Sequence, residues 1–126
     1  TVSFSEVRST GNVTAYYSDE RLKDFTGKID NAVDKVKQLN GYYFKENQKA
    51  KKLGYKNDKQ QVGVNAQEVQ KVLPEVIDIA PISHTEGVDE EYLTVHYEKL
   101  VPLLIEAIKD QQRQIDELNQ RISAWH

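Results

Sequence analysis

The stretch YEKLVPLLIEAIKDQQRQIDELNQRISAW, residues 97–125, decides the fold of this chain. Its apolar side chains recur at alternating steps of four and three residues, which is the a/d pattern of a coiled coil over about four heptads. This pattern predicts a long C-terminal helix whose apolar seam is buried by sister helices. The a positions are Val101, Ile108, Ile115 and Ile122, and the d positions are Tyr97, Leu104, Gln111, Leu118 and Trp125.

The number of helices in this coiled coil does not follow from the seam in a simple way. Isoleucine at a with leucine at d favours two strands. Gln111 and Trp125 interrupt that pattern, and the e and g positions carry little charge that would select partners. A single amphipathic helix packed on its own domain is the alternative. The e and g residues are Gln112, Gln114, Asn119 and Arg121.

Composition limits the class of protein. The chain has 126 residues, enough for one domain with a modest core, and 29% of them are charged. The net charge of −3 argues against a protein that binds nucleic acid through its phosphates. Cysteine is absent, and neither a membrane-spanning apolar run nor a signal peptide is present. Methionine is also absent, so we expect the natural chain to begin earlier.

The rest of the chain predicts a small mixed domain of short strands and helices, an α+β fold. Residues 1–17 alternate in polarity around Gly11-Asn12, which predicts two short strands and a turn. Residues 45–59 are polar and lysine-rich, which predicts a protruding hairpin or loop. The other predicted elements are a helix over 29–39, an extended segment from 42, a strand over 62–66, a helix over 66–72 ended by Pro74, a strand over 76–82, a loop over 84–91 and a partner strand over 92–95.

Residues 18–23, SDERLK, place a serine five positions before a lysine. A serine hydroxyl becomes a nucleophile when a neutral lysine amine takes its proton. An ordinary lysine amine has a pKa near 10.4, so such a base needs apolar surroundings that lower its pKa. The alternative is a helix cap, with Ser18 at the N-cap and Asp19 and Glu20 in the first turn. The candidate pocket walls are Tyr16, Tyr17, Leu22 and Phe25.

Three later stretches strengthen the first interpretation: GVNAQEV at 63–69, LPEV at 73–76 and YLTVHY at 92–97. In this order and spacing, together with the serine and lysine, they resemble the C-terminal intramolecular chaperone of phage endosialidases, tailspikes and neck appendages. The resemblance covers about residues 16–122. His96 departs from it, because an acidic residue is expected before the tyrosine.

This resemblance implies a homotrimer that assists the folding of an upstream fibre and then cuts itself off with a Ser18–Lys23 dyad. Residues 1–17 would then end the fibre, and 18–126 would form the chaperone domain, with 97–125 as a trimeric coiled coil. We expect this to happen during virion assembly in the host cytoplasm, with the domain leaving the mature virion after cleavage. No cofactor or metal is implied.

Geometry selects the bond that is cut. The Ser18 hydroxyl can reach the carbonyl of Tyr17 in an N-to-O acyl shift, whereas attack on its own carbonyl would close a strained four-membered ring. The Tyr17–Ser18 bond is therefore the predicted cleavage site, with Ser18–Asp19 as the less favoured one. Donors to the oxyanion are either backbone N–H groups of the next short helix or the side chains of Asn65 or Gln67.

Three other functions remain open from the sequence. A trimerisation tip that is never cut predicts the same coiled coil without the chemistry. A receptor- or glycan-binding fibre tip would use exposed aromatic side chains, although such residues more often form a core. Binding of nucleotide or nucleic acid through the lysines of 45–59 lacks a glycine-rich phosphate loop, and the scattered histidines give little support to a metal site. The aromatic candidates are Tyr42, Tyr43, Phe44, Tyr55 and Trp125.

Overall fold

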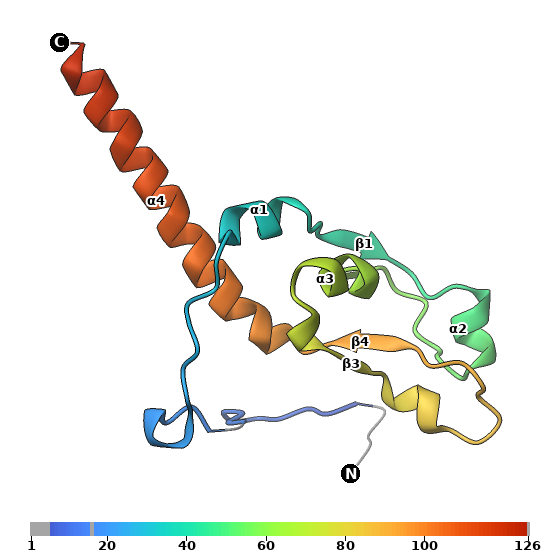
Figure 1. Ribbon diagram of the computed structural model, residues 1–126. Helices are drawn as coiled ribbons and strands as arrows, with labels where there is room; N and C mark the ends of the chain where they lie inside the picture. Colours follow the sequence, from blue (N-terminus) through green and yellow to red (C-terminus); the bar gives the residue numbers. More distant parts are fainter. Residues whose placement is uncertain (1–5, 16, 126) are drawn as a thin grey trace.

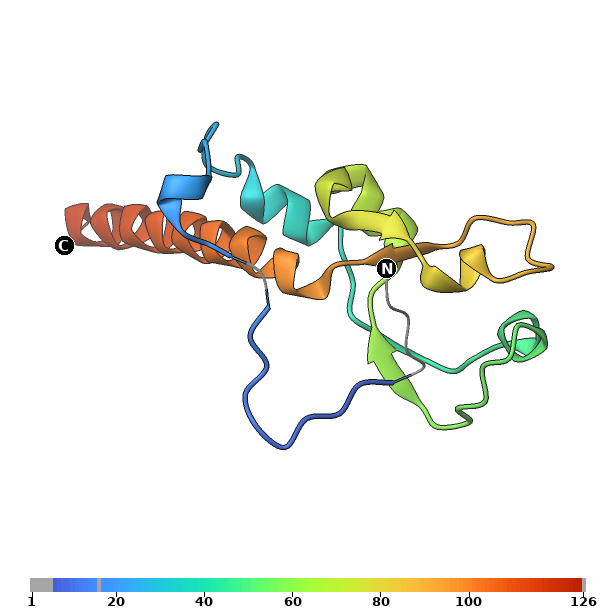
Figure 2. The ribbon, with the colours of Figure 1, turned by 90° about the horizontal axis from the view of Figure 1, so that it is seen from below.

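The computed structural model describes residues 6–15 and 17–125 of the chain (Figure 1). Short helices and strands precede one long helix, α4, which projects well beyond the rest of the chain in both views (Figures 1 and 2). The α+β prediction is confirmed. The elements are η1 (Glu20–Leu22), α1 (Ala32–Lys37), β1 (Tyr42–Phe44), α2 (Gln48–Lys52), β2 (Gln61–Gly63), α3 (Ala66–Val72), η2 (Pro74–Val76), β3 (Ile77–Ile79), η3 (Pro81–His84), β4 (Leu93–Val95), η4 (Tyr97–Leu100) and α4 (Val101–Ala124).

The N-terminal segment corrects one prediction. Residues 6–15 and 17 form exposed coil with a bend at Thr10-Gly11, so the two strands predicted within 1–17 do not form in the described part of that segment. Val7 and Val13 of this segment are both largely exposed, so they form no buried face. A strand needs a hydrogen-bonding neighbour and a buried face, and this segment finds neither within the single chain.

The two central helices follow local signals. Helix α3 spans Ala66–Val72 as predicted, because Asn65 caps its start and Pro74 prevents its continuation. Helix α1 is shorter than the predicted 29–39, since Asn31 takes a left-handed conformation with a φ of 48° and the helix begins after it. Asparagine is among the few residues that adopt this conformation readily.

Two separate two-stranded antiparallel sheets complete the fold. Strands β1 and β2 pair Tyr43 with Val62, and their connection is the lysine-rich segment, which forms a hairpin arm containing α2. Strands β3 and β4 pair Ile77 with Val95, which confirms the predicted partnership. Strand β3 is shorter than the predicted 76–82, because Pro81 starts the 3-10 helix η3 and a proline cannot donate to a strand ladder.

The hydrophobic core is small and lies where α1, α3 and η2 meet the start of α4. Leu103 and Ala107 of α4 are buried against this group. Helix α1 packs along the first turns of α4, whereas the C-terminal part of α4 has no neighbour in either view (Figures 1 and 2). The core members are Ala32, Val69, Leu73, Val76, Leu103 and Ala107.

The chain exposes far more surface than a compact monomer would. Its accessible surface is 11109 Å², against about 6,900 Å² for a compact protein of 14.5 kDa. Much of the excess belongs to the projecting helix and the extended N-terminal segment. A single chain with this shape therefore leaves many of its large apolar side chains exposed.

Candidate functional site

Ser18 and Lys23 lie in direct contact. The Lys23 Nζ donates a hydrogen bond to the Ser18 Oγ at 3.0 Å, across five positions of sequence. The intervening 3-10 turn η1 brings the two side chains together, because the N–H of Lys23 bonds back to the carbonyl of Glu20. A hydroxyl and an amine at this distance can exchange a proton in either direction.

The cap of this turn corrects the alternative interpretation of the serine. Asp19, not Ser18, is the N-cap of η1, and its side chain accepts the N–H of Arg21 at 2.9 Å. The Ser18 hydroxyl is therefore not used to cap the turn and instead receives the lysine amine. A carboxylate at the N-cap satisfies a backbone donor that would otherwise lack a partner.

Arg21 completes the turn from the other side. Its guanidinium binds the Asp19 carboxylate through two nitrogens, with Nε at 3.0 Å from Oδ1 and Nη2 at 2.8 Å from Oδ2. The side-chain hydrogen bond from Arg21, followed by its backbone N–H, holds the pKa of Asp19 below its ordinary value. The same side-chain bond raises the pKa of the Arg21 guanidinium. The two charges thus neutralise each other within the turn.

The predicted walls around the lysine do not enclose it within one chain. Tyr16 lies outside the described residues. The Tyr17 ring lies 6.0 Å from the Lys23 Nζ, and both Leu22 and Phe25 are largely exposed, at 65% and 73%. The residues that the structure describes therefore leave Lys23 exposed to water in the single chain.

Asn65 and Gln67, the predicted oxyanion donors, belong to the start of α3. The Asn65 side-chain oxygen accepts the N–H groups of Gln67 at 2.9 Å and Glu68 at 3.2 Å, so it caps this helix. Both views show η1 well apart from α3 (Figures 1 and 2). Within one chain the structure does not bring these side chains to Ser18. Their predicted role would require contact between chains.

The predicted a/d seam of α4 forms one continuous exposed stripe. Ile108 is 65% exposed, although its neighbour Ala107 is buried against the domain. The helix therefore has two apolar faces, and the seam is the one left uncovered. The other exposed seam residues are Tyr97, Val101, Leu104, Gln111, Ile115, Leu118, Ile122 and Trp125.

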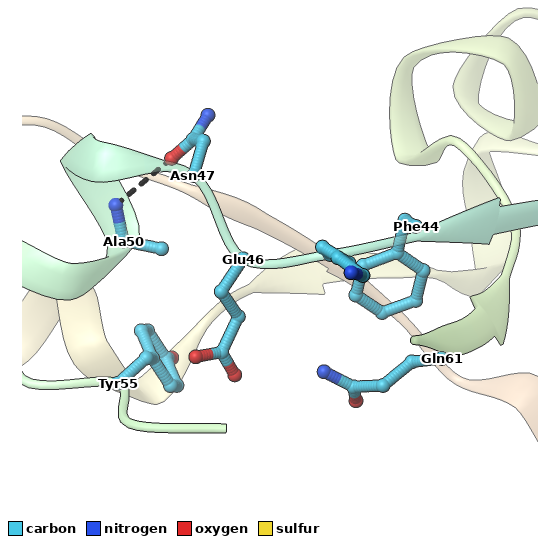
Figure 3. A pocket seen from close by; sticks show the side chains of 7 residues that line it. Phe44, Glu46, Asn47, Ala50, Tyr55 and Gln61 are labelled. Carbon is cyan, nitrogen blue, oxygen red and sulfur yellow. Dashed lines mark hydrogen bonds between the residues drawn. The ribbon is translucent and has the colours of Figure 1, made fainter. Parts of the chain in front are cut away.

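A concave site lies at the base of the hairpin arm, apart from η1. Its volume is about 410 Å³, and Figure 3 shows Phe44, Tyr55 and Gln61 around it. The Gln61 Nε2 is shielded from water and has no hydrogen-bond partner among the described residues. The remaining lining residues are Lys45, Glu46, Asn47 and Ala50.

Ion pairs tie the arm to the rest of the domain. The Lys49 Nζ lies 2.9 Å from Glu90 in the loop before β4 and 5.6 Å from the centre of the Tyr92 ring. Lys51 pairs with Asp58 within the arm. Some of the lysines that the sequence brought into consideration for nucleic acid are thus neutralised by carboxylates.

His96 makes its own local contact. Its Nε2 lies 3.2 Å from the Asp78 Oδ2, across the β3–β4 pair, and its Nδ1 lies 3.6 Å from Glu98. In residues 6–15 and 17–125 no three metal-ligating side chains come together. Over the same residues, no helix is long and apolar enough to cross a bilayer.

Comparison of the sequence with known proteins finds a matching family and several relatives. Residues 18–78 match the model of a peptidase family described as chaperone of endosialidase, and the match begins at Ser18. The long tail fiber protein Gp37 of Enterobacteria phage K3 is 34% identical over 105 residues, which is 83% of this chain and 8% of that protein. Gp37 of Enterobacteria phage T2 gives the same identity over 7% of its length. Gp37 of Escherichia phage AR1 is 31% identical over 93 residues, 74% of this chain and 8% of that protein. The chain thus spans less than a tenth of each of these relatives.

Proposed function

Because residues 18–78 make this chain a member of the chaperone of endosialidase family, we propose that it is the intramolecular chaperone of a phage fibre. It trimerises through α4, assists folding of the chain that precedes it, and releases itself by cutting the Tyr17–Ser18 bond. The observation that carries this proposal is the 3.0 Å contact between the Lys23 Nζ and the Ser18 Oγ. The fibre relatives support the same assignment.

In the proposed cleavage, the Ser18 hydroxyl and the Lys23 amine each act in two successive steps. Neutral Lys23 takes the proton of the Ser18 hydroxyl while the Oγ attacks the carbonyl carbon of Tyr17. The lysine then gives that proton to the departing Ser18 nitrogen, so the peptide bond becomes an ester. Water attacks the ester while Lys23 accepts a proton from the water, and the lysine then returns that proton to the Ser18 oxygen, which leaves as a hydroxyl. The products are a carboxyl group at Tyr17 and a free amine at Ser18.

Assembly provides the timing. In the isolated chain the Lys23 amine is exposed and lies within hydrogen-bonding distance of the Ser18 hydroxyl. A charged lysine cannot accept a proton. Burial of the amine under sister chains or under the upstream fibre would favour its neutral form. Leu22 and Phe25, which are exposed beside it, are apolar surfaces suited to such packing. Cleavage then follows folding and does not precede it.

The uncovered seam of α4 supports association with sister chains. Burying an exposed apolar stripe of this length supplies the driving force, at about 25 cal/mol per Å². Isoleucine and leucine packing alone would favour two strands, and the family resemblance implies three, so we propose a homotrimer. Helices joined at the C-terminus hold three upstream chains at an effective concentration that reaches about millimolar.

Self-release explains why a fibre would use such a domain. Intertwined β-structure folds slowly, because its contacts join distant or separate chains. We propose that the hairpin arm, residues 45–59, holds the upstream stalk while it winds. Once the chaperone is cut away, the fibre can no longer unfold by the route through which it formed. We place this step in virion assembly in the host cytoplasm, with the chaperone absent from the mature particle.

The test uses a longer chain that includes upstream residues, analysed by intact mass. We expect two fragments with the cut between Tyr17 and Ser18, and one uncut chain for Ser18→Ala. Lys23→Arg is the matched change for the base, because it keeps the positive charge but cannot accept a proton at neutral pH. Cleavage at the wild-type rate in Lys23→Ala or Lys23→Arg would contradict the dyad.

A second candidate, a fibre tip that binds a receptor and is not cut, is favoured by the concave site of Figure 3. Two aromatic rings and the Gln61 Nε2, which has no hydrogen-bond partner in the described part of the chain, are groups that suit a hydroxyl-rich ligand such as a sugar. Glycan-array binding by the uncut chain, lost in Tyr55→Ala, together with a single mass for the longer chain, would support it over the chaperone.

A further inference from the structure

We propose that Asp19 and Arg21 form a positioning pair that holds Ser18 and Lys23 in register and keeps the carboxylate of this turn away from the lysine. The proposal rests on the proposed self-cleavage. It assigns a role to two residues beside the dyad that do not themselves touch the reacting atoms. We call these two residues the Asp19–Arg21 clamp.

The turn is held by hydrogen bonds and not by packing. None of the residues of η1 is buried, and Asp19 and Arg21 are themselves exposed. The Asp19 carboxylate accepts the backbone N–H of Arg21 at 2.9 Å, and the Asp19 carbonyl accepts the N–H of Leu22 at 3.1 Å. Because no residue of η1 is buried, loss of the clamp would let residue 23 move away from residue 18.

The clamp also keeps the negative charge of Asp19 from acting on the Lys23 amine. Arg21 binds both oxygens of the Asp19 carboxylate, at 3.0 Å to Oδ1 and 2.8 Å to Oδ2. A carboxylate free to approach the Lys23 amine would favour its charged form, which is useless as a base. Arg21 occupies that carboxylate, and its own positive charge opposes a second one nearby. Among the described residues Lys23 forms no ion pair, and its contacts are the Ser18 hydroxyl and the Tyr17 ring.

Two other carboxylates of this segment also lie close to the dyad in sequence. Glu20 and Asp24 flank the dyad in sequence, and both are exposed. In residues 6–15 and 17–125, neither carboxylate forms an ion pair with Lys23. Asp19 thus differs from these two carboxylates because its charge is compensated within the turn. The clamp therefore predicts opposite effects from removing its two members.

Two substitutions separate geometry from charge. Asp19→Asn keeps an oxygen that can cap the turn and removes the negative charge, so the remaining Arg21 lowers the pH at which Lys23 loses its proton. Arg21→Gln leaves the Asp19 carboxylate uncompensated, so that pH rises. We expect each shift to be about one pH unit, which is about a tenfold change in cleavage rate on the acid side of the profile. The double variant should return the midpoint to near that of the wild type.

The experiment follows cleavage of the longer chain against pH for these variants, with Glu20→Gln as the matched control. Glu20 carries the same charge one residue away and has no side-chain bond in the turn among the described residues. We expect the control to move the midpoint less than either clamp variant. Equal rate losses in both clamp variants without a midpoint shift would overturn the charge role. Wild-type rates in both would overturn the clamp altogether.

A second readout keeps this proposal separate from the proposed function. Titration of the Lys23 side chain by NMR, in assembled Ser18→Ala chains, reports the protonation of the amine without any cleavage. Opposite midpoint shifts in Asp19→Asn and Arg21→Gln would support the clamp even if the wild-type chain were never cut. Identical midpoints would reject the charge role of the clamp even if cleavage were observed.

Discussion

Ala107 and Ile108 are neighbours on α4, yet Ala107 is 4% exposed and Ile108 is 65% exposed. Ala107 packs against the chain's own domain, whereas Ile108 lies on the uncovered a/d seam. One helix thus carries an intramolecular face over its first turns and a separate apolar face that the described residues leave uncovered. If this second face binds sister chains as proposed, the domain can remain folded while its oligomeric state changes.

The first prediction follows from these two faces. Ile108→Asp should dissociate the assembly into folded monomers, because a charge on the seam cannot be buried against sister helices. Light scattering measures the mass and circular dichroism measures the fold. Gln120→Asp places the same charge outside the seam and should leave the mass unchanged. An Ile108→Asp protein that keeps its wild-type mass would contradict the seam.

Leu103 and Leu104 provide a second pair of opposite effects. Leu103 is fully buried, so Leu103→Ala should lower the free energy of unfolding by about 2–5 kcal/mol. Leu104 is 46% exposed on the seam, so the effect of Leu104→Ala should depend on protein concentration. Thermal unfolding at two concentrations distinguishes them. Equal, concentration-independent losses would argue that both leucines serve the same core.

A third prediction concerns the close approach of Tyr97 to β2. The Tyr97 hydroxyl accepts the N–H of Val64 at 3.2 Å, and a Cβ added at Gly63 would lie 2.9 Å from that hydroxyl. Gly63→Ala should therefore cost about 1–3 kcal/mol of stability through overpacking. Gly41→Ala is the control, since its Cβ would meet nothing within 4 Å. Denaturant midpoints give both values, and equal midpoints would contradict the contact.

Asn65 gives a fourth test, which separates capping from catalysis. Asn65→Ala should destabilise the protein by about 1 kcal/mol through loss of the α3 cap, whereas Asn65→Asp keeps the cap. We expect Asn65→Asp to cleave at the wild-type rate, because α3 lies apart from the turn η1 within one chain (Figure 1). Slower cleavage in a stable Asn65→Asp protein would instead show that the amide reaches the oxyanion from a sister chain.

The fifth prediction is a dependence of stability on pH. The N–H of Ile79, and then His96, hold the pKa of the Asp78 carboxyl below its ordinary value of 3.8. A lowered pKa means that this carboxylate stabilises the fold above about pH 4 and loses that contribution as the pH falls through its folded-state pKa. Urea unfolding should therefore show a gap between wild type and Asp78→Asn at neutral pH that closes in acid. Glu117→Gln, an exposed change on α4, should show no such closing gap.

Local signals in the sequence were sufficient for several elements. Asn65 and Pro74 bound α3 in any context, because a cap and a missing N–H act over a few residues. The pairing of β3 with β4 followed from alternating apolar residues on either side of a polar loop. The spacing of Ser18 and Lys23 indicated the candidate site, and a short turn was enough to bring the two side chains together.

The strands predicted within residues 1–17 do not form in residues 6–15 and 17, and the reason is physical. Alternation in residues 1–17 describes a chain that would fit a sheet, but no strand lies beside the described part of this segment to accept its hydrogen bonds. The cap of η1 was also misassigned, because Ser18 and Asp19 are both good N-caps and the sequence does not say which faces the turn. The bidentate contact of the Arg21 guanidinium with the Asp19 carboxylate decides that Asp19 is the cap.

By itself, the sequence determined the elements whose causes are local: the α3 boundaries, the heptad seam of α4, and the five-residue spacing that allows a serine to meet a lysine. Tertiary structure alone decided which face of α4 packs inward, because Leu103 and Ala107 become core residues only when α1 lies across them. It also left the seam uncovered. The periodicity of the sequence predicts that one stripe of α4 is apolar, whereas the packing of distant segments determines whether that stripe is covered.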